Sequence, residues 1–256
     1  MSGWGGTGEA YEASYASLCA GTNAALVAAL APANGRRVLD VGSGTGALAE
    51  RLQTAGWRVD ACEPESSMRQ VAAQRHSGIE YGDGALPDLP FADAAFDAVT
   101  ANFVLNHVDD PRRSARELAR VLVPGGTLAA TIWSHSPTWF WATVCERAGL
   151  APAIGGRLPA DRDFERTASG FERMLLEADW AQVEVTELQW TWRVVPTALW
   201  TSAEGGVATA GAFYRSLDAA QQLRFRTAFD ALCADHVQDG LLGLEHSAAI
   251  ALATTG

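Results

Sequence analysis

The segment that decides the fold reads Val38-Leu39-Asp40-Val41-Gly42-Ser43-Gly44-Thr45-Gly46. Its apolar first half predicts a buried strand, and the pattern from Thr45 onward is typical of a helix. Glycines at a strand-to-helix turn permit tight turning and a close approach of the backbone to a ligand. The segment therefore predicts a strand, a ligand-binding loop and a helix in direct succession.

The glycine loop alone leaves the ligand open. Residues 42–47 also fit the dinucleotide fingerprint, and simple strand-to-helix turns use glycine too. Glu63 ends the next predicted strand, where a carboxylate can accept hydrogen bonds from both hydroxyls of a ribose in either class of cofactor. Asp83 follows the third predicted strand and suits an exocyclic adenine amine. A nicotinamide-binding protein has less reason to place a carboxylate there.

Strand and helix patterns alternate outward from this segment. Strands are predicted at residues 37–41, 58–62, 79–82, 96–101, 127–133, 183–194 and 247–254, and helices at 45–55, 65–74, 111–122, 138–149, 171–179 and 219–234. Such alternation requires parallel strands joined by helical crossovers. We predict an α/β fold with an open, seven-stranded, mostly parallel sheet flanked by helices.

Three further segments surround this predicted sheet. Residues 1–34 are expected to form a helical lid, and about 196–240 a helical cap inserted before the last strand. Residues 151–170 are expected to be a loop or short insertion. No linker divides the chain, so residues 1–256 are expected to form a single domain.

Composition narrows the class of protein and its partners. Thirty acidic and 19 basic residues give a net charge of -11, which opposes a polyanion such as nucleic acid. The four cysteines form no cluster, so we expect neither a metal site nor a disulfide framework. Neither a signal peptide nor a membrane-spanning run is predicted, and we expect a cytoplasmic protein without membrane association.

Four motifs in order carry a family resemblance. They are VLDVGSGTG at 38–46, ACEPESSM at 61–68, GDGALPDLPFADAAFDAV at 82–99 and RVLVPGGTLAATIW at 120–133. Together they resemble class I S-adenosylmethionine-dependent methyltransferases, in the branch called methyltransferase type 11 that is related to the ubiquinone and menaquinone biosynthesis methyltransferases. The resemblance covers about residues 35–133 strongly and the remainder by topology only.

The resemblance implies S-adenosylmethionine as cofactor and a role for each matching residue. It puts the methionine part near the glycine loop and the loop after the fourth strand, and the adenosine part near the ends of the second and third strands. The implied cofactor-binding residues are Tyr15, Asp40, Gly42, Ser43, Gly44, Glu63, Met68, Asp83, Gly84, Ala85, Asn102 and Phe103. Plain packing remains the alternative for Tyr15, Met68 and Ala85, and holding the turn remains the alternative for Asp40.

Methyl transfer asks the protein mainly for alignment and exclusion of water, with a base if the acceptor is a hydroxyl. His107 and His135 follow the fourth and fifth predicted strands and are the candidate bases, with structural roles as their alternatives. Tryptophans gather at 133–141 and 190–200, which suits either an aromatic acceptor pocket or ordinary packing. We expect O- or C-methylation of a small, largely apolar or aromatic molecule. An NAD(P)-dependent oxidoreductase and a non-catalytic S-adenosylmethionine-binding protein are the rival interpretations.

Overall fold

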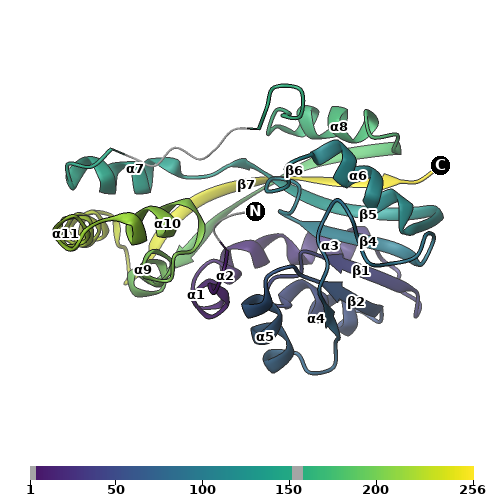
Figure 1. Ribbon diagram of the computed structural model, residues 1–256, viewed down its shortest axis with the longest axis horizontal. Coiled ribbons are helices and arrows are strands. Elements are labelled where there is room, and N and C mark those ends of the chain that lie inside the picture. The colour runs from purple at the N-terminus through teal and green to yellow at the C-terminus, as the bar shows by residue number, and fades with distance from the viewer. Residues whose placement is uncertain (1–3, 152–157) are drawn as a thin grey trace.

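The computed structural model describes residues 4–151 and 158–256, and its centre is a seven-stranded sheet in the order β3-β2-β1-β4-β5-β7-β6 (Figure 1). The strands are β1 (Arg37–Val41), β2 (Arg58–Cys62), β3 (Tyr81–Gly82), β4 (Phe96–Asn102), β5 (Leu122–His135), β6 (Ala181–Val194) and β7 (Leu242–Thr254). The first five strands in this order, from β3 across to β5, pair in parallel. Strand β7 is antiparallel to both of its neighbours, β5 and β6. The predicted open, mostly parallel sheet is confirmed.

Helices cover both faces of the sheet. They are α4 (Ala47–Thr54), α5 (Ser66–Arg75), α6 (Pro111–Arg120), α7 (Thr138–Arg147) and α8 (Ala168–Leu176). In Figure 1, α6 and α8 lie above the sheet and α4 and α5 below it. The strand order reverses between β1 and β4, and ligands bind beyond the carboxyl ends of the strands at such a switch point.

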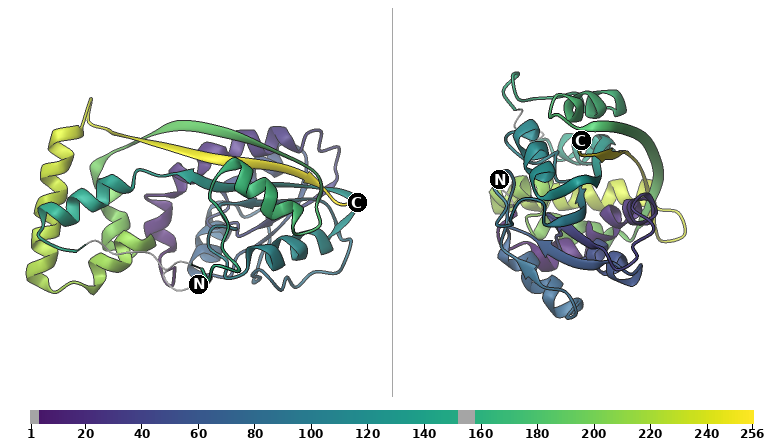
Figure 2. Two further views of the ribbon diagram at one scale, coloured as in Figure 1. Left: turned by 90° about the horizontal axis from the view of Figure 1, so that it is seen from above. Right: turned by 90° about the vertical axis from the view of Figure 1, so that its right-hand side faces the viewer.

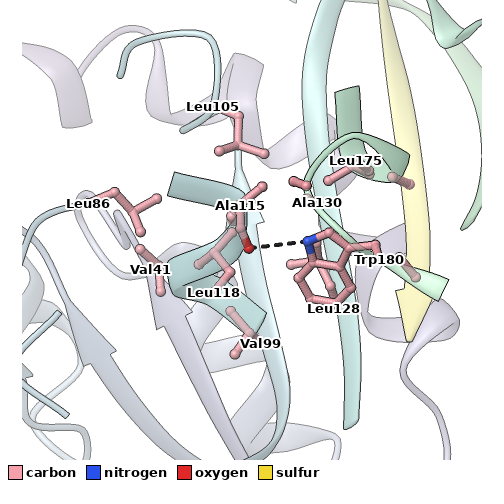
Figure 3. Close-up of a cluster of buried hydrophobic side chains, with 14 of the residues drawn as sticks. Val41, Leu86, Val99, Leu105, Ala115, Leu118, Leu128, Ala130, Leu175 and Trp180 are labelled. Atoms are coloured by element: carbon pink, nitrogen blue, oxygen red, sulfur yellow. Dashed lines mark hydrogen bonds between the residues drawn. The ribbon is translucent and has the colours of Figure 1, made fainter. Parts of the chain in front are cut away.

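Each face of the sheet has its own apolar core. Leu118 of α6 and Leu175 of α8 pack on one face with Val99 and Leu128 of the sheet. Figure 3 shows this cluster with the indole of Trp180, whose Nε1 donates to the Ala115 carbonyl at 3.1 Å. The opposite face packs against α4 and against the N-terminal segment, the residues that precede β1. Burial on both faces explains why the central strands read as continuous apolar runs.

The cap has a separate apolar core. Helices α9 (Pro196–Glu204), α10 (Ala208–Ser216) and α11 (Ala219–His236) lie between β6 and β7 in the chain, and α7 joins them. The core of the cap is aromatic and includes Phe140, Trp200, Phe225 and Phe229. Figure 2 shows β6 and β7 running from the sheet into the cap. Strands β6 and β7 are therefore part of both the sheet and the cap.

The N-terminal segment is a series of short helices. They are α1 (Gly8–Glu12), α2 (Ala16–Cys19), the 3₁₀ turn η1 (Ala20–Thr22) and α3 (Asn23–Ala29). Gly8 N donates to Ser67 Oγ at 3.0 Å and Gly6 N to Glu65 Oε1 at 3.2 Å, which holds the segment against the start of α5. Among the described residues, no helix is long and apolar enough to cross a membrane.

Several element bounds differ from those predicted. Strand β5 begins at Leu122 rather than at the predicted residue 127, because residues 123–126, which include Pro124-Gly125-Gly126, form a bulge where the pairing jumps from Phe96↔Leu122 to Ala98↔Thr127. Strand β7 begins at Leu242 and β3 shrinks to Tyr81–Gly82. Of the predicted loop at 151–170, residues 152–157 lie outside the described residues, and α8 already begins at Ala168.

Candidate functional site

A cavity of about 350 Å³ opens at the carboxyl ends of the parallel strands, where the sheet meets the N-terminal segment and the cap. The glycine loop and Glu63 line one part of it. Aromatic side chains line much of the rest: Trp4, Tyr11, Tyr15, Phe103, Trp133, Phe140, Trp141 and Trp192. Residues from distant parts of the chain thus share one space at the edge where α/β sheets bind ligands.

The glycine loop requires glycine for two separate reasons. Gly42 and Gly44 have φ of 65° and 54°, in the left-handed region that favours glycine. A Cβ at Gly42 would also lie 2.5 Å from Cγ2 of Val104. Gly42 and Gly44 both line the cavity, so the backbone itself forms part of its wall.

Glu63 holds the glycine loop and faces the cavity. Its Oε2 accepts from Gly44 N at 3.1 Å and its Oε1 from Glu65 N at 2.9 Å. Burial raises the pKa of this carboxyl, and the two backbone donors oppose that rise. Since an ionised carboxylate can accept about four hydrogen bonds, each oxygen keeps capacity for a ligand hydroxyl.

Unpaired polar atoms gather behind the glycine loop. Within the described part of the chain, Asp40 Oδ2, Ser43 Oγ and Asn23 Nδ2 are buried without a hydrogen-bond partner. These residues border a second cavity of about 40 Å³. Buried polar atoms without partners are costly, so the oxygens of Asp40 and Ser43 fit a ligand amine, and the Asn23 amide nitrogen, a donor, fits an ordered water. The residues present therefore fit the predicted cofactor at its methionine and ribose ends.

Asn102 and Phe103 connect the cavity to the N-terminal segment and to β5. Asn102 Oδ1 accepts from Thr22 Oγ1 at 2.8 Å and Thr131 Oγ1 at 2.6 Å. Phe103 has φ of 58° and stacks on Trp133 with ring centroids 3.7 Å apart. Both residues line the cavity. Left-handed backbone at a phenylalanine is strained, and such strain is concentrated at functional sites.

Four more of the predicted residues border the same space. Met68 of α5 is buried, and the loop after β3 contributes Gly84 and Ala85. Tyr15 of the N-terminal segment is the fourth, and its hydroxyl accepts from Trp141 Nε1 at 3.1 Å. Burial raises the pKa of Tyr15, which keeps it protonated at neutral pH. The N-terminal segment thus closes one side of the cavity.

Asp83 and His135 are predicted site residues that do not line the cavity. The Asp83 side chain is 75% exposed and lies 3.3 Å from Arg69 of α5. His135 is exposed because a bulge shifts the pairing from Trp133↔Ala248 to His135↔Ser247. Without that bulge Trp133 and His135 would share a face, since strand side chains alternate with a period of two.

His107 does line the cavity, beside Trp4, whose ring centroid lies 5.7 Å away. The residue is exposed. The surrounding protein nevertheless disfavours the charged form and lowers the pKa of His107, and Arg166 adds to this effect. The ring is therefore neutral at neutral pH.

His246 is a cavity residue that sequence reasoning missed. It is only 6% exposed and lines the cavity with Leu244, two positions earlier on β7. The last strand was predicted to begin at residue 247, one position after this histidine. The alternation of inward-facing and outward-facing side chains continues back through His246 and Leu244. This pattern could have placed His246 on the last strand.

Known proteins share sequence with part of this chain. Residues 39–130 match a family model described as a methyltransferase domain. The chain is 38% identical over 131 residues to a demethylmenaquinone methyltransferase of Paenarthrobacter aurescens, a match that covers 50% of this chain and 52% of that protein. It is 34% identical over 170 residues to an uncharacterised methyltransferase of Mycobacterium tuberculosis, covering 66% of this chain and 64% of the other. The chain thus spans about half to two thirds of these relatives.

Solved structures share the fold. The YcgJ protein of Bacillus subtilis superposes with a TM-score of 0.59 at 18% identity, over 92% of this chain and 98% of its own. Identity this low supports the fold alone. The fold, unlike the family match, extends beyond the cofactor half into the region of β6 and β7.

Proposed function

Because residues 39–130 match a methyltransferase domain model and the motifs of the chain resemble those of class I methyltransferases, we propose that the protein transfers a methyl group from S-adenosylmethionine to a small, largely apolar or aromatic molecule. The observation that carries the proposal is one continuous cavity. It joins the glycine loop and Glu63 to the aromatic walls formed by Trp133, Trp141 and Trp192.

The residues of the two cavities support one placement of the cofactor within this proposal. The two oxygens of Glu63 are offered to the ribose hydroxyls, and the glycine loop lies against the methionine part, with Asp40 near its ammonium. Met68 and Ala85 flank the adenine. S-adenosylmethionine supplies an activated methyl group, so the protein contributes orientation and exclusion of water. The exposed, Arg69-paired position of Asp83 leaves the adenine amine to backbone groups near Gly84.

The acceptor half of the cavity suits a neutral molecule. Among the described residues lining the cavity there is no arginine, and Glu63 is the one carboxylate. A phosphate or carboxylate acceptor would lack a cationic partner there. The relatives named demethylmenaquinone methyltransferase support a quinone-like acceptor. We propose transfer to oxygen or carbon.

Isothermal titration calorimetry with S-adenosylhomocysteine, NAD and NADP tests the cofactor assignment. We expect the first to bind and the other two to bind far more weakly. Glu63→Ala should weaken binding by about 1 to 3 kcal/mol, because it removes hydrogen bonds to a charged acceptor. Glu80→Ala, an exposed carboxylate just before β3, is the matched control and should leave the affinity unchanged.

Two outcomes would contradict the proposal. Equal affinity of wild type and Glu63→Ala for S-adenosylhomocysteine would remove Glu63 from the ribose site. Binding without any transfer of labelled methyl groups to a panel of phenols, quinols and amines would instead favour a protein that binds the cofactor without catalysis.

A further inference from the structure

His246 lies in a cluster of aromatic rings that we call the histidine box, made of His246, Trp133, Trp190 and Trp192. Its ring centroid is 5.5 Å from Trp133, 5.8 Å from Trp190 and 6.2 Å from Trp192. The register Trp190↔His246 puts these rings on one face of the β6–β7 pair. The histidine is therefore packed in place rather than free on a loop.

The hydrogen bonds of His246 determine which ring nitrogen is free. Nδ1 lies 2.9 Å from the Leu244 carbonyl oxygen. A carbonyl only accepts, so Nδ1 carries the proton and Nε2 keeps its lone pair in the neutral ring. No described residue forms a hydrogen bond with Nε2. A buried histidine that lines a cavity thus keeps one acceptor nitrogen for a ligand.

The position of His246 separates it from the cofactor end. Strand β7 is four strands from β2, which carries Glu63 at its end. At about 4.8 Å between neighbouring strands, this separation is about 19 Å. His246 therefore lines the aromatic end of the cavity, where the acceptor is proposed to bind.

The surroundings of His246 keep it neutral. Burial lowers its pKa, the Leu244 hydrogen bond opposes this, and the neighbouring His135 on β5 lowers it further. The facing side chains of β6 are Trp190 and Trp192, which do not titrate at neutral pH. Across the cavity the titratable residues are Tyr11, Tyr15, Cys19, Glu63 and His107. Among the described residues, none of these groups forms an ion pair with His246.

We propose, building on the proposed methyl transfer, that His246 Nε2 is the general base for a neutral, planar aromatic acceptor that carries a hydroxyl group. The hydroxyl hydrogen bonds to Nε2 while the ring of the acceptor lies against the histidine box. As the hydroxyl O–H bond breaks, its proton moves to Nε2 and the oxygen keeps the electron pair. That pair forms the new bond to the methyl carbon, and the electrons of the methyl–sulfur bond stay on sulfur.

The charge balance of this step favours catalysis in an apolar cavity. A neutral hydroxyl, a neutral imidazole and one sulfonium become a methyl ether, an imidazolium and a neutral thioether. One positive charge is present before and after the step, so no additional charge is created inside the aromatic walls. The imidazolium then loses its proton to water through the open side of the cavity.

Binding of 2-naphthol to the protein saturated with S-adenosylhomocysteine tests the acceptor class without requiring turnover. We expect binding to wild type and a three- to tenfold weaker affinity in His246→Phe, which keeps an aromatic ring but loses both nitrogens. The methyl ether of 2-naphthol has no proton to donate and should bind both proteins equally. His236→Gln, on the exposed side of α11, is the control variant and should match wild type.

Turnover of 2-naphthol with labelled S-adenosylmethionine tests the base. His246→Gln keeps a hydrogen-bonding group without a usable base, so kcat should fall by about 10²- to 10⁴-fold while affinity for S-adenosylhomocysteine is retained. In wild type kcat should decline at acid pH, as His246 becomes protonated, and the variants should lose this limb.

Each remaining result has one meaning. If S-adenosylhomocysteine does not bind to wild type, the proposed function fails. If S-adenosylhomocysteine binds but 2-naphthol does not bind or is not methylated, the role of His246 is refuted and the proposed function stands. The same conclusion follows if His246→Phe and His246→Gln keep kcat within tenfold. Loss of the acid limb in His107→Gln instead of the His246 variants would transfer the base to His107.

Discussion

Asp40 is a carboxyl group in the interior of β1, with only 1% of its surface exposed. Its Oδ1 accepts from Thr100 Oγ1 at 2.7 Å, while Oδ2 has no partner among the described residues. Burial disfavours the charged form and raises the pKa of Asp40 to about 7. The protein thus keeps an incompletely paired acid beside its glycine loop.

This raised pKa predicts how stability depends on pH. The folded state holds the Asp40 proton more tightly than the unfolded state, so this group's contribution is present at low pH and lost as pH rises from about 4 through 7. Asp40→Asn should remove this decline in the free energy of unfolding. The decline amounts to about 1.4 kcal/mol for each tenfold difference in proton affinity between the folded and unfolded states. Urea unfolding of both proteins at pH 4.5 to 8 measures it. Parallel stability curves across this range would show that Asp40 has an ordinary pKa.

At the level of elements, the N-terminal segment depends on its contact with α5. Gly8 is buried at the start of α1, and a Cβ there would lie 2.4 Å from the Ser67 carbonyl oxygen. Because the clash is with backbone, the segment must shift to relieve it. Trp4, Tyr11 and Tyr15 on this segment line the cavity, so the contact also affects the site.

Gly8→Ala should therefore weaken binding of S-adenosylhomocysteine by tenfold or more, about 1.4 kcal/mol, and should speed proteolysis within the first 30 residues. Gly5→Ala is the matched control, because a Cβ at Gly5 has no heavy atom within 4 Å. Calorimetry and limited proteolysis provide the two readouts. If both variants behave as wild type does, the N-terminal segment takes no part in holding the cofactor.

At the scale of the whole molecule, charge and cavity point to the same kind of partner. The net charge is -11, while the lining of the cavity is largely apolar and aromatic. An acidic surface repels phosphates, and non-specific nucleic-acid binding depends on releasing counterions from neutralised phosphates. Both properties support the proposed small, neutral acceptor.

We accordingly expect no binding of duplex DNA or transfer RNA at micromolar concentrations and physiological salt. Fluorescence anisotropy with labelled nucleic acids measures this, first with the protein alone and then with S-adenosylhomocysteine added. Micromolar affinity that weakens steeply with added salt would point to a basic surface patch and to a nucleic-acid acceptor.

Local sequence patterns predicted the sheet and the cofactor half of the site. The glycine loop and Glu63 are specified by a strand, a turn and a second strand within residues 38–63, and the structure brings Glu63 to within hydrogen-bond distance of Gly44 N. Met68, Ala85, Asn102 and Phe103, which the family resemblance put near the cofactor, also line the cavity. These positions follow strand ends, and parallel strands all end at one edge of the sheet.

Only the tertiary structure decided the acceptor half. A bulge in β5 turns His135 away from the cavity. In the cofactor half, the exposed Asp83 side chain pairs with Arg69 on α5 and does not line the cavity. His246 reaches the cavity because β7 pairs antiparallel with β6. The β6 residues that it packs against lie more than 50 positions earlier in the chain than His246. The sequence by itself therefore determined what short-range periodicity and glycine geometry encode. Strand register, bulges and contacts between distant segments depend on the packing free energy of the whole fold. A local sequence pattern does not contain this information.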